Sequence, residues 1–471
     1  MRAFYSLMWW VFMPLVLLRL LLRGRKEPGY RQHWGERLGF YGAKPAPAAA
    51  RATAGATHAA ASASAPATIW VHAVSVGETR AAEPLVDALL AEYPASRIIL
   101  THMTPTGRAT GMSLFAKHGE RLTQSYLPYD TASMVRRFIR HFEPRICILM
   151  ETEVWPNLIA VCNEQKVPVV LANARLSERS LRKAGRFGRL MLDAAAGISL
   201  VAAQTEADAN RIRSLGVKKV DITGSIKFDV VVPEAALATG AALRRAINGV
   251  DAVSGAAADA SAMERASPSR PVLLCASTRE GEEELILQAF MDARTALPSN
   301  VLLLIVPRHP QRFDEVEKMI SARGLSVERR SLLALDSIDA AVSMDTQVLL
   351  GDSMGEMFAY YAACDCAFVG GSLLPLGGQN LIEPAALGKP VLIGPHTFNF
   401  ALVTEDAIAA GGAQRIADAS ELMSQAARLL ADDAARIDMG RNALAFANQH
   451  RGATRRTVAL LPELLRHRPN A

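Results

Sequence analysis

Short apolar runs rich in β-branched residues alternate with segments of helical periodicity along most of this chain. Strands that alternate with helices in this way form parallel sheets whose two faces are covered by helices. Helical periods lie, for example, over 81–92 and 134–142. The predicted strands are 69–76, 97–101, 146–150, 167–171, 198–203 and 220–223 in the first half, and 272–276, 301–306, 348–350, 367–369 and 391–393 in the second. We therefore predict an α/β protein with two Rossmann-like domains facing a cleft.

Two stretches of biased composition interrupt this alternation. Residues 43–68 are rich in Ala, Pro, Ser and Thr, and residues 251–270 have the same character. Such segments bury little apolar surface, so we predict a flexible insert at 43–68 and a flexible linker at 251–270. Few contacts cross a linker, and the domain boundary is therefore expected there. The predicted domains are 27–250 and 271–471, within the two or three domains that about 150 residues per domain suggests for a chain of 471 residues.

The N-terminal segment predicts a membrane anchor over residues 1–26. Residues 4–22 are apolar apart from Ser6 and Arg19, and their number is close to the ~20 residues of a spanning helix. Basic residues cluster after the apolar segment, whereas a secretory signal carries them before it. The positive-inside rule then keeps the basic flank and the rest of the chain in the cytoplasm. Trp9, Trp10 and Pro14 lie inside the segment, so a helix that lies in the interface is the alternative to a spanning one.

Composition narrows the classes of function. The chain has 52 Lys and Arg against 46 Asp and Glu, a net charge of +6, which suits a partner that carries phosphates: a nucleotide, a nucleic acid or an anionic membrane. Five cysteines exclude a disulfide scaffold, and the close pair Cys364 and Cys366 has no second pair with which to bind zinc. The motifs of P-loop NTPases, NAD dehydrogenases, zinc proteases and α/β-hydrolases are missing. No Asp-x-Asp follows a strand, so we predict no metal site.

Candidate residues in the first half follow the predicted strands, because ligands of open α/β sheets bind beyond the carboxyl ends of the strands. Glu78 follows the strand 69–76, where it is either a general base or a glutamate that stabilises a helix start. Glu151 follows the strand 146–150 and forms a second acidic strand end. Asn173 begins a third polar strand end, 173–177, where Ser177 is predicted to cap a helix. That helix presents either a solvated face or a basic surface for lipid phosphates. Its basic residues are Arg179, Arg182, Lys183, Arg186 and Arg189.

The second half has polar strand ends of a different kind. Arg308 follows the strand 301–306, and its planar guanidinium suits a phosphate. Glycine-rich turns at 370–372 and 377–378 come after another strand and before a helix, so backbone N–H groups and the helix dipole favour a phosphate there. Glu383, just inside that helix, is placed to accept hydrogen bonds from ribose hydroxyls.

Taken together, these residues resemble the 3-deoxy-D-manno-octulosonic acid (Kdo) transferases of lipopolysaccharide assembly, which are glycosyltransferases with the two-domain GT-B fold. The resemblance covers nearly the whole chain outside the two biased stretches. Its motifs lie at 31–39, 75–78, 104–107, 127–130, 150–157, 172–177, 224–229, 306–310 and 394–400. One departure is that Gln379 and Leu381 replace the His and Pro of the family pattern.

The resemblance implies roles for particular residues. Glu78 would be the catalytic base, and Glu151 and Lys227 would assist the transition state. The residues implied to hold the CMP of the donor are Pro307, Arg308, Met354, Gly355, Glu356, Asn380, Leu381, Ile382 and Glu383.

The implied reaction is direct transfer of Kdo from CMP-Kdo to a lipid A precursor (lipid IVA), with inversion. The resemblance implies neither a metal nor another cofactor, and no nucleic-acid partner. The enzyme would be anchored on the cytoplasmic side of the inner membrane. Another enzyme of this fold, either a different nucleotide-sugar transferase or an epimerase, is the first alternative. An inert membrane-bound nucleotide-binding protein is the second, and the intact Glu78 and donor half argue against it.

Overall fold

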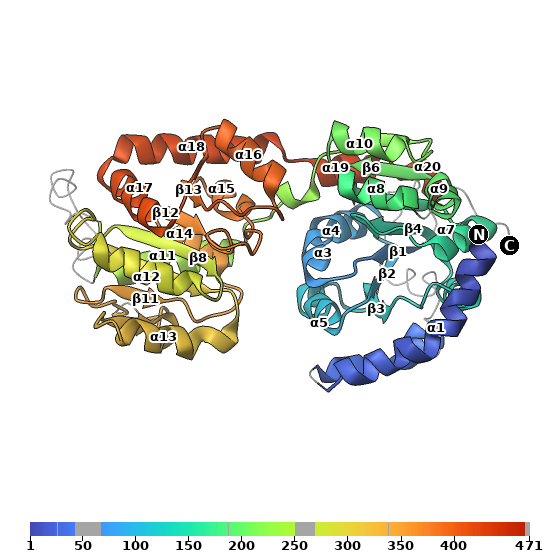
Figure 1. Ribbon diagram of the computed structural model, residues 1–471, viewed down its shortest axis with the longest axis horizontal. Helices are drawn as coiled ribbons and strands as arrows, with labels where there is room; N and C mark the ends of the chain where they lie inside the picture. Colours follow the sequence, from blue (N-terminus) through green and yellow to red (C-terminus); the bar gives the residue numbers. More distant parts are fainter. Residues whose placement is uncertain (26, 43–66, 187, 250–268, 338, 467–471) are drawn as a thin grey trace, which may run out of the picture. The chain divides into compact units, whose positions relative to one another are not determined.

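A computed structural model describes residues 1–25, 27–42, 67–186, 188–249, 269–337 and 339–466 (Figure 1). The chain divides into two compact units: unit 1 is Met1–Asp229 with His450–Ala471, and unit 2 is Val230–Gln449. The predicted boundary at 251–270 is therefore wrong. Helix α11 (Glu234–Asn248), which precedes it, packs on α14 (Met357–Ala363) of unit 2. The predicted insert and linker fall almost entirely outside the described residues.

Unit 1 contains a parallel sheet of seven strands in the order β3-β2-β1-β4-β5-β6-β7. Its strands alternate between the two faces: Ile69 and Val71 of β1 pack into one apolar cluster, and Trp70 packs into the other. Burial on both faces accounts for the nearly continuous apolar strand sequences. The strands are β1 Thr68–His72, β2 Arg97–His102, β3 Leu122–Tyr126, β4 Pro144–Met150, β5 Val169–Ala174, β6 Leu200–Ala203 and β7 Val220–Ile222.

Unit 2 contains a second parallel sheet of seven strands, in the order β10-β11-β9-β8-β12-β13-β14. Leu273 and Cys275 of β8 face one cluster, and Leu274 and Ala276 face the other. Cys364 and Cys366 are buried free thiols. The strands are β8 Val272–Thr278, β9 Leu302–Pro307, β10 Val327–Arg329, β11 Val348–Leu350, β12 Cys366–Val369, β13 Val391–Ile393 and β14 Ala413–Arg415.

Helices cover the sheets (Figure 1). In unit 1 they are α1 Arg2–Arg23, α2 Trp34–Arg37, α3 Val76–Ala81, α4 Glu83–Glu92, α5 Pro105–Leu114, α6 Ala132–Phe142, α7 Pro156–Glu164, α8 Glu178–Arg186, α9 Arg189–Ala196, α10 Glu206–Arg213, α19 Ala453–Ala459 and α20 Pro462–Arg466. In unit 2, besides α11 and α14, they are α12 Glu282–Asp292, α13 Phe313–Ser321, α15 Ile382–Ala386, α16 Ala401–Ala409, α17 Ala419–Ala431 and α18 Asp433–Gln449.

Both sheets have a switch point, at which the direction of strand addition reverses. In unit 1 it lies between β1 and β4, and in unit 2 between β8 and β12. The loops that leave these strands at their carboxyl ends diverge to opposite faces and leave room for a ligand. The fold thus singles out the residues after β1 and β4, and those after β8 and β12.

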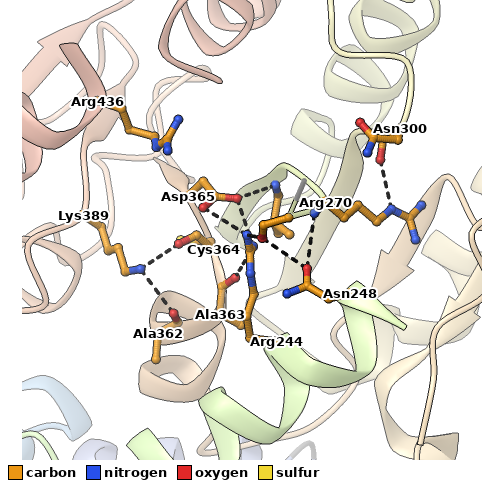
Figure 2. Close-up of polar contacts among 12 residues, drawn as sticks. Arg244, Asn248, Arg270, Asn300, Ala362, Ala363, Cys364, Asp365, Lys389 and Arg436 are labelled. Atoms are coloured by element: carbon orange, nitrogen blue, oxygen red, sulfur yellow. Dashed lines mark hydrogen bonds and ion pairs between the residues drawn. The ribbon is translucent and has the colours of Figure 1, made fainter. Parts of the chain in front are cut away.

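The amino ends of the unit 2 strands are held by a network of side chains (Figure 2). Arg244 of α11 pairs with Asp365, with distances of 2.9 Å (Nη1–Oδ2) and 3.3 Å (Nη2–Oδ1), and it also donates to Ala363 O. Asp365 accepts from Val272 N at 2.8 Å, and Lys389 Nζ donates to Cys364 O at 2.7 Å. These bonds join α11 and the end of α14 to the start of β8, at the edge opposite the switch-point loops.

The last helices return to unit 1 and close its core. Ala453, Val458, Leu461 and Leu465 pack into the cluster that contains Ile69 and Val71. The Asp229 carboxylate accepts from Gly452 N and from Thr454 N, each at 2.5 Å. Unit 1 is therefore built from both ends of the chain.

The helix α1 packs along unit 1 at both of its ends. Near its start, Arg2 Nη2 lies 2.9 Å from Glu164 Oε1, and Ser6 Oγ donates to Asn157. Farther on, Met13 and Leu20 are buried in a cluster with Tyr30, Tyr129 and Met134. Among the described residues α1 is the one helix long and apolar enough to cross a membrane, and 11% of its most apolar window is buried. Its outward apolar residues are Phe4, Leu7, Trp10, Val11, Phe12, Leu15, Leu18, Leu21 and Leu22.

Candidate active site

Glu78 lies in the first turn of a helix beside the switch point of unit 1. Strand β1 ends at His72 and α3 begins at Val76, so the predicted strand 69–76 is too long and the helix begins earlier than residue 81. Ser75 caps α3 by accepting from Glu78 N at 3.5 Å, and the Glu78 carboxylate accepts from Val74 N at 2.5 Å. This reciprocal arrangement is a variant of the capping box. The interpretation of Glu78 as a helix-start glutamate is therefore confirmed, while its role as a base stays a prediction.

The environment of Glu78 raises its pKa to about 7, mainly because burial removes water from the carboxylate. The backbone N–H of Val74 lowers this pKa, Glu153 and Glu151 raise it, and Lys227 lowers it. These electrostatic effects also show that Glu78, Glu151 and Lys227 lie in one region of unit 1. A carboxyl group with a pKa near 7 is suited to accept a proton at neutral pH.

Glu151 follows β4, on the other side of the switch point. Its carboxylate is buried and forms ion pairs with Lys227 Nζ at 2.9 Å and with Arg175 Nε at 3.3 Å. Its φ of +57° is unusual for a residue with a side chain, and such strain concentrates at functional sites. Glu151 is thus held in place by two cations and by a constrained backbone.

Asn173, at the end of the neighbouring strand β5, positions Lys227. It also has a positive φ, +52°, and its Oδ1 accepts from Ile226 N at 3.1 Å. That bond fixes the short helix Ile226–Phe228, which carries Lys227. Sequence reasoning placed Asn173 at a polar strand end but missed this role, although its motif gave a signal. Glu153 was also not singled out, and burial raises its pKa.

The predicted basic helix is two helices, because α8 ends at Arg186 and α9 begins at Arg189. Ser177 caps α8 as expected, accepting from Ser180 N at 3.2 Å. Arg182 and Arg189 pair with acidic residues of their own helices, Glu178 at 3.8 Å and Asp193 at 3.9 Å, with strongly exposed side chains. These two arginines therefore fit the solvated interpretation.

The donor residues predicted in unit 2 all lie at or just beyond the carboxyl ends of its strands. Pro307 ends β9, and the backbone N–H of Arg308 donates to Thr278 O at the end of β8. After β11 come the exposed Met354 and Gly355, whose φ of +85° favours glycine. Glu356 directly precedes α14, and its carboxylate accepts from Arg330 Nη2 at 3.0 Å and from Ser353 Oγ at 2.6 Å.

The segment from Asn380 to Glu383 joins the glycine-rich turn to the start of α15. Asn380 Oδ1 accepts from Ile382 N, and Asn380 Nδ2 donates to Glu383, each at 3.1 Å. The side chains of Leu381 and Ile382 are completely buried, so these two residues offer a ligand only their backbone. The replacement Leu381 thus belongs to the core. No group of three His, Cys, Asp or Glu that suits a metal ion is found among the described residues.

Two parallel seven-stranded sheets, one with carboxylates at its switch point and the other with cationic and glycine-rich strand ends, define a glycosyltransferase of the GT-B fold. Residues 32–230 match the family described as 3-deoxy-D-manno-octulosonic-acid transferase (kdotransferase). The 3-deoxy-D-manno-octulosonic acid transferase of Bordetella pertussis is 43% identical over 98% of this chain and 99% of its own length. That of Haemophilus influenzae is 36% identical over 98% and 99%. The chain belongs to the Kdo transferase family.

A solved structure with a similar fold is the UDP-GlcNAc 2-epimerase from Neisseria meningitidis bound to UDP-GlcNAc. It superposes with a TM-score of 0.53 over 84% of this chain and 100% of the epimerase chain. Its sequence identity is 15%, so the likeness concerns the fold alone.

Proposed function

We propose that this transferase moves Kdo from CMP-Kdo to a hydroxyl group of a lipid A precursor, lipid IVA, by a single displacement with inversion at the anomeric carbon. The observation that carries the proposal is the Glu78 carboxyl group, whose pKa is raised to about 7 beside the Glu151–Lys227 ion pair. Glu78 takes the proton of the attacking hydroxyl. Lys227 and Glu151 keep the charges around that proton transfer fixed in position.

Unit 2 is assigned the donor. Arg308 binds the phosphate of CMP, helped by the backbone around Asn380 and by the first turn of α15. Gly355 allows the backbone after β11 to approach the nucleotide, and Glu356 and Glu383 accept hydrogen bonds from its hydroxyl groups. Charge on the departing CMP is stabilised by these groups, so we propose a reaction that requires neither a metal ion nor another cofactor.

We further propose that α1 lies in the membrane interface on the cytoplasmic side of the inner membrane. This choice between the two sequence interpretations is supported by the contacts of α1 with unit 1 at both ends, since a helix bound along its own domain cannot also cross the bilayer. The outward apolar residues of α1 would enter the membrane. Arg19, Arg25 and Arg31 are exposed near its end and would meet anionic headgroups.

Mass spectrometry of the product tests the proposed reaction. The full-length enzyme is incubated with CMP-Kdo and a tetraacylated lipid A precursor, and the Glu78→Gln variant is the control. We expect the acceptor to gain the mass of Kdo with the wild-type enzyme only. A parallel binding screen with CMP, UDP and GDP should favour CMP. Preference for UDP, or conversion of the donor sugar with no gain of mass by the acceptor, would instead support the epimerase alternative.

A further inference from the structure

Arg279 lies at the switch point of unit 2, directly after the central strand β8. The register between β8 and β9 shifts between Ala276 and Thr278, and Ser277 there has a φ of +55°. An extra residue of this kind bends a strand and redirects the side chains that follow it. Arg279 is half-buried, and among the described residues no carboxylate lies within ion-pair distance of its guanidinium. An arginine in this position is suited to an anionic ligand.

Gln379 approaches the same point from the loop after β12. A methyl group at Gly371, which has a φ of +70°, would lie 3.1 Å from Gln379 Nε2 and 3.6 Å from Arg279 Cγ. The two side chains thus flank one glycine, although they come from different loops. The loop is fixed because Gln379 N donates to Gly370 O at 3.0 Å and Gly378 N donates to Gly371 O at 2.6 Å.

A buried carboxylate ties these two loops together. Glu282 is fully buried and accepts from Arg279 N at 2.9 Å, Gly371 N at 2.6 Å and Leu373 N at 2.9 Å. Its oxygens are therefore engaged by backbone N–H groups. The backbones of the two loops that carry Arg279 and Gln379 are thus held together before any ligand binds, which lowers the entropy cost of binding.

Three arginines, Arg279, Arg308 and Arg312, lie near His309 at this edge of the sheet. The pKa of His309 is lowered, first by partial burial and then by the nearby Arg279, Arg308 and Arg312. Arg312 is already paired with Glu283 at 2.9 Å and with Glu315 at 3.2 Å. Arg279 and Arg308, whose backbones are neighbours at the ends of β8 and β9, therefore supply the cationic character of this edge.

We propose that Arg279 and Gln379 form a subsite for the carboxylate of the transferred sugar acid, distinct from the phosphate site at Arg308. This inference rests on the proposed function, because that donor carries two anionic groups, a phosphate and the carboxylate of the sugar acid. The guanidinium fork binds a carboxylate through two parallel hydrogen bonds, and the Gln379 amide adds a neutral donor. The chain thus provides one arginine for each anionic group.

The test separates the two anions by changing the enzyme and the ligand together. Competition constants are measured in full-length wild type and Arg279→Ala for CMP, for CMP-Kdo and for the carboxamide of CMP-Kdo, which lacks only the carboxylate charge. Arg279→Ala should weaken binding of CMP-Kdo by about ten- to a hundredfold, the usual effect of losing a hydrogen bond to a charged group. It should leave the affinity for CMP within about twofold, a difference well below the effect of one charged hydrogen bond. The carboxamide should bind both proteins equally.

Several results would overturn the subsite. An equal loss for CMP and CMP-Kdo would place Arg279 on the phosphate, and unchanged binding of CMP-Kdo would remove it from the donor site. If Arg279→Ala does not fold, Arg279→Lys and Gln379→Ala provide the same comparison. Arg441→Ala, on the exposed face of α18, is the matched control and should change none of the constants. Failure of the proposed function is distinguishable, because the wild type would then not transfer Kdo at all.

Discussion

Lys227 Nζ lies 2.9 Å from Glu151 Oε1, and this bond joins the short helix after β7 to the end of β4. The Glu151 side chain is 7% exposed and that of Lys227 is 26% exposed. The carboxylate of this ion pair is therefore shielded from solvent, and its attraction to a cation is stronger than it would be in water. It lies in the same region as Glu78 and contributes to the pKa of that residue.

Lys227→Met should destabilise unit 1, because it leaves the buried Glu151 with Arg175 as its cation. Removal of one partner from a buried pair costs up to about 3–5 kcal/mol. Lys219→Met is the matched control, since Lys219 pairs with Glu463 at 3.5 Å on an exposed surface. That loss should stay within about 1 kcal/mol. Urea unfolding measures the loss in free energy of unfolding for both variants. Similar losses would show that the buried Glu151–Lys227 pair contributes no more to stability than the exposed Lys219–Glu463 pair.

Glu78→Gln should abolish most transfer without loss of donor affinity. The amide can still accept from Val74 N, so α3 stays capped, but it cannot accept a proton. General-base catalysis contributes typically about 10²–10⁴ in rate, which is the expected fall in kcat. Glu83→Gln, in the exposed pair with Lys117, is the control. A fall in kcat of less than about tenfold would remove Glu78 from the role of base.

The rate should rise with pH through the pKa of Glu78, about 7, because only the ionised carboxylate accepts a proton. Stability has the opposite sign. The folded state holds this proton more tightly than the unfolded state, so the contribution of Glu78 to stability is fully present below the ordinary glutamate pKa of 4.5 and is lost as pH rises through about 7. Wild type should thus lose stability relative to Glu78→Gln across that interval. A pH-independent difference between the two proteins in thermal unfolding would contradict the raised pKa.

Gly370→Ala should disturb the donor site from within the sheet. A methyl group there would lie 2.7 Å from Ser277 O and 2.7 Å from Thr278 Cα. Both are backbone atoms, so the clash can be relieved only if the backbone itself moves. Overpacking of this kind costs typically about 1–3 kcal/mol. Gly42→Ala is the control, because no atom of the described residues lies within 4 Å of its added methyl group. Calorimetry with CMP should show weaker binding for Gly370→Ala alone, and wild-type affinity would mean that this junction does not shape the site.

The outward face of α1 should carry membrane binding, and its inward face should carry stability. Replacing Leu7, Leu15 and Leu18 by Ser should release the protein from vesicles in flotation assays while leaving the fold intact, since all three are exposed. Met13→Ser should instead destabilise unit 1, because Met13 is buried. Wild type in native membranes should resist high salt but be extracted by alkaline carbonate. Retention in carbonate would favour a spanning helix.

Much of the fold was predictable because the central strands are buried on both faces and read as apolar runs. All the predicted strands are confirmed to within a few residues at each end. The strands that were missed, β3, β10 and β14, are all at sheet edges and include polar residues such as Gln124, Glu328 and Gln414. An edge strand needs fewer apolar residues, so its pattern is weak.

The site was predictable in its residues and less so in its geometry. The run 69–76 looked like one strand because Val74 and Val76 are β-branched, yet Ser75 and Glu78 have the spacing of a capping box and mark the helix start. The pairing of Lys227 with Glu151 left no pattern in the sequence, because it depends on tertiary structure. The return of the chain to unit 1 at His450 was equally hidden, since an amphipathic helix does not specify which sheet it covers.

That return affects how the protein is made on the ribosome. Most of unit 1 is synthesised before unit 2, but α19 and α20, which close its core, follow unit 2 in the chain, and the start of α19 binds Asp229. During translation the whole of unit 2 must emerge before unit 1 has all of its parts. The half of the enzyme that is translated first is thus completed last. A premature stop codon shortly after Gln449 would spare the later-made unit and damage the earlier one.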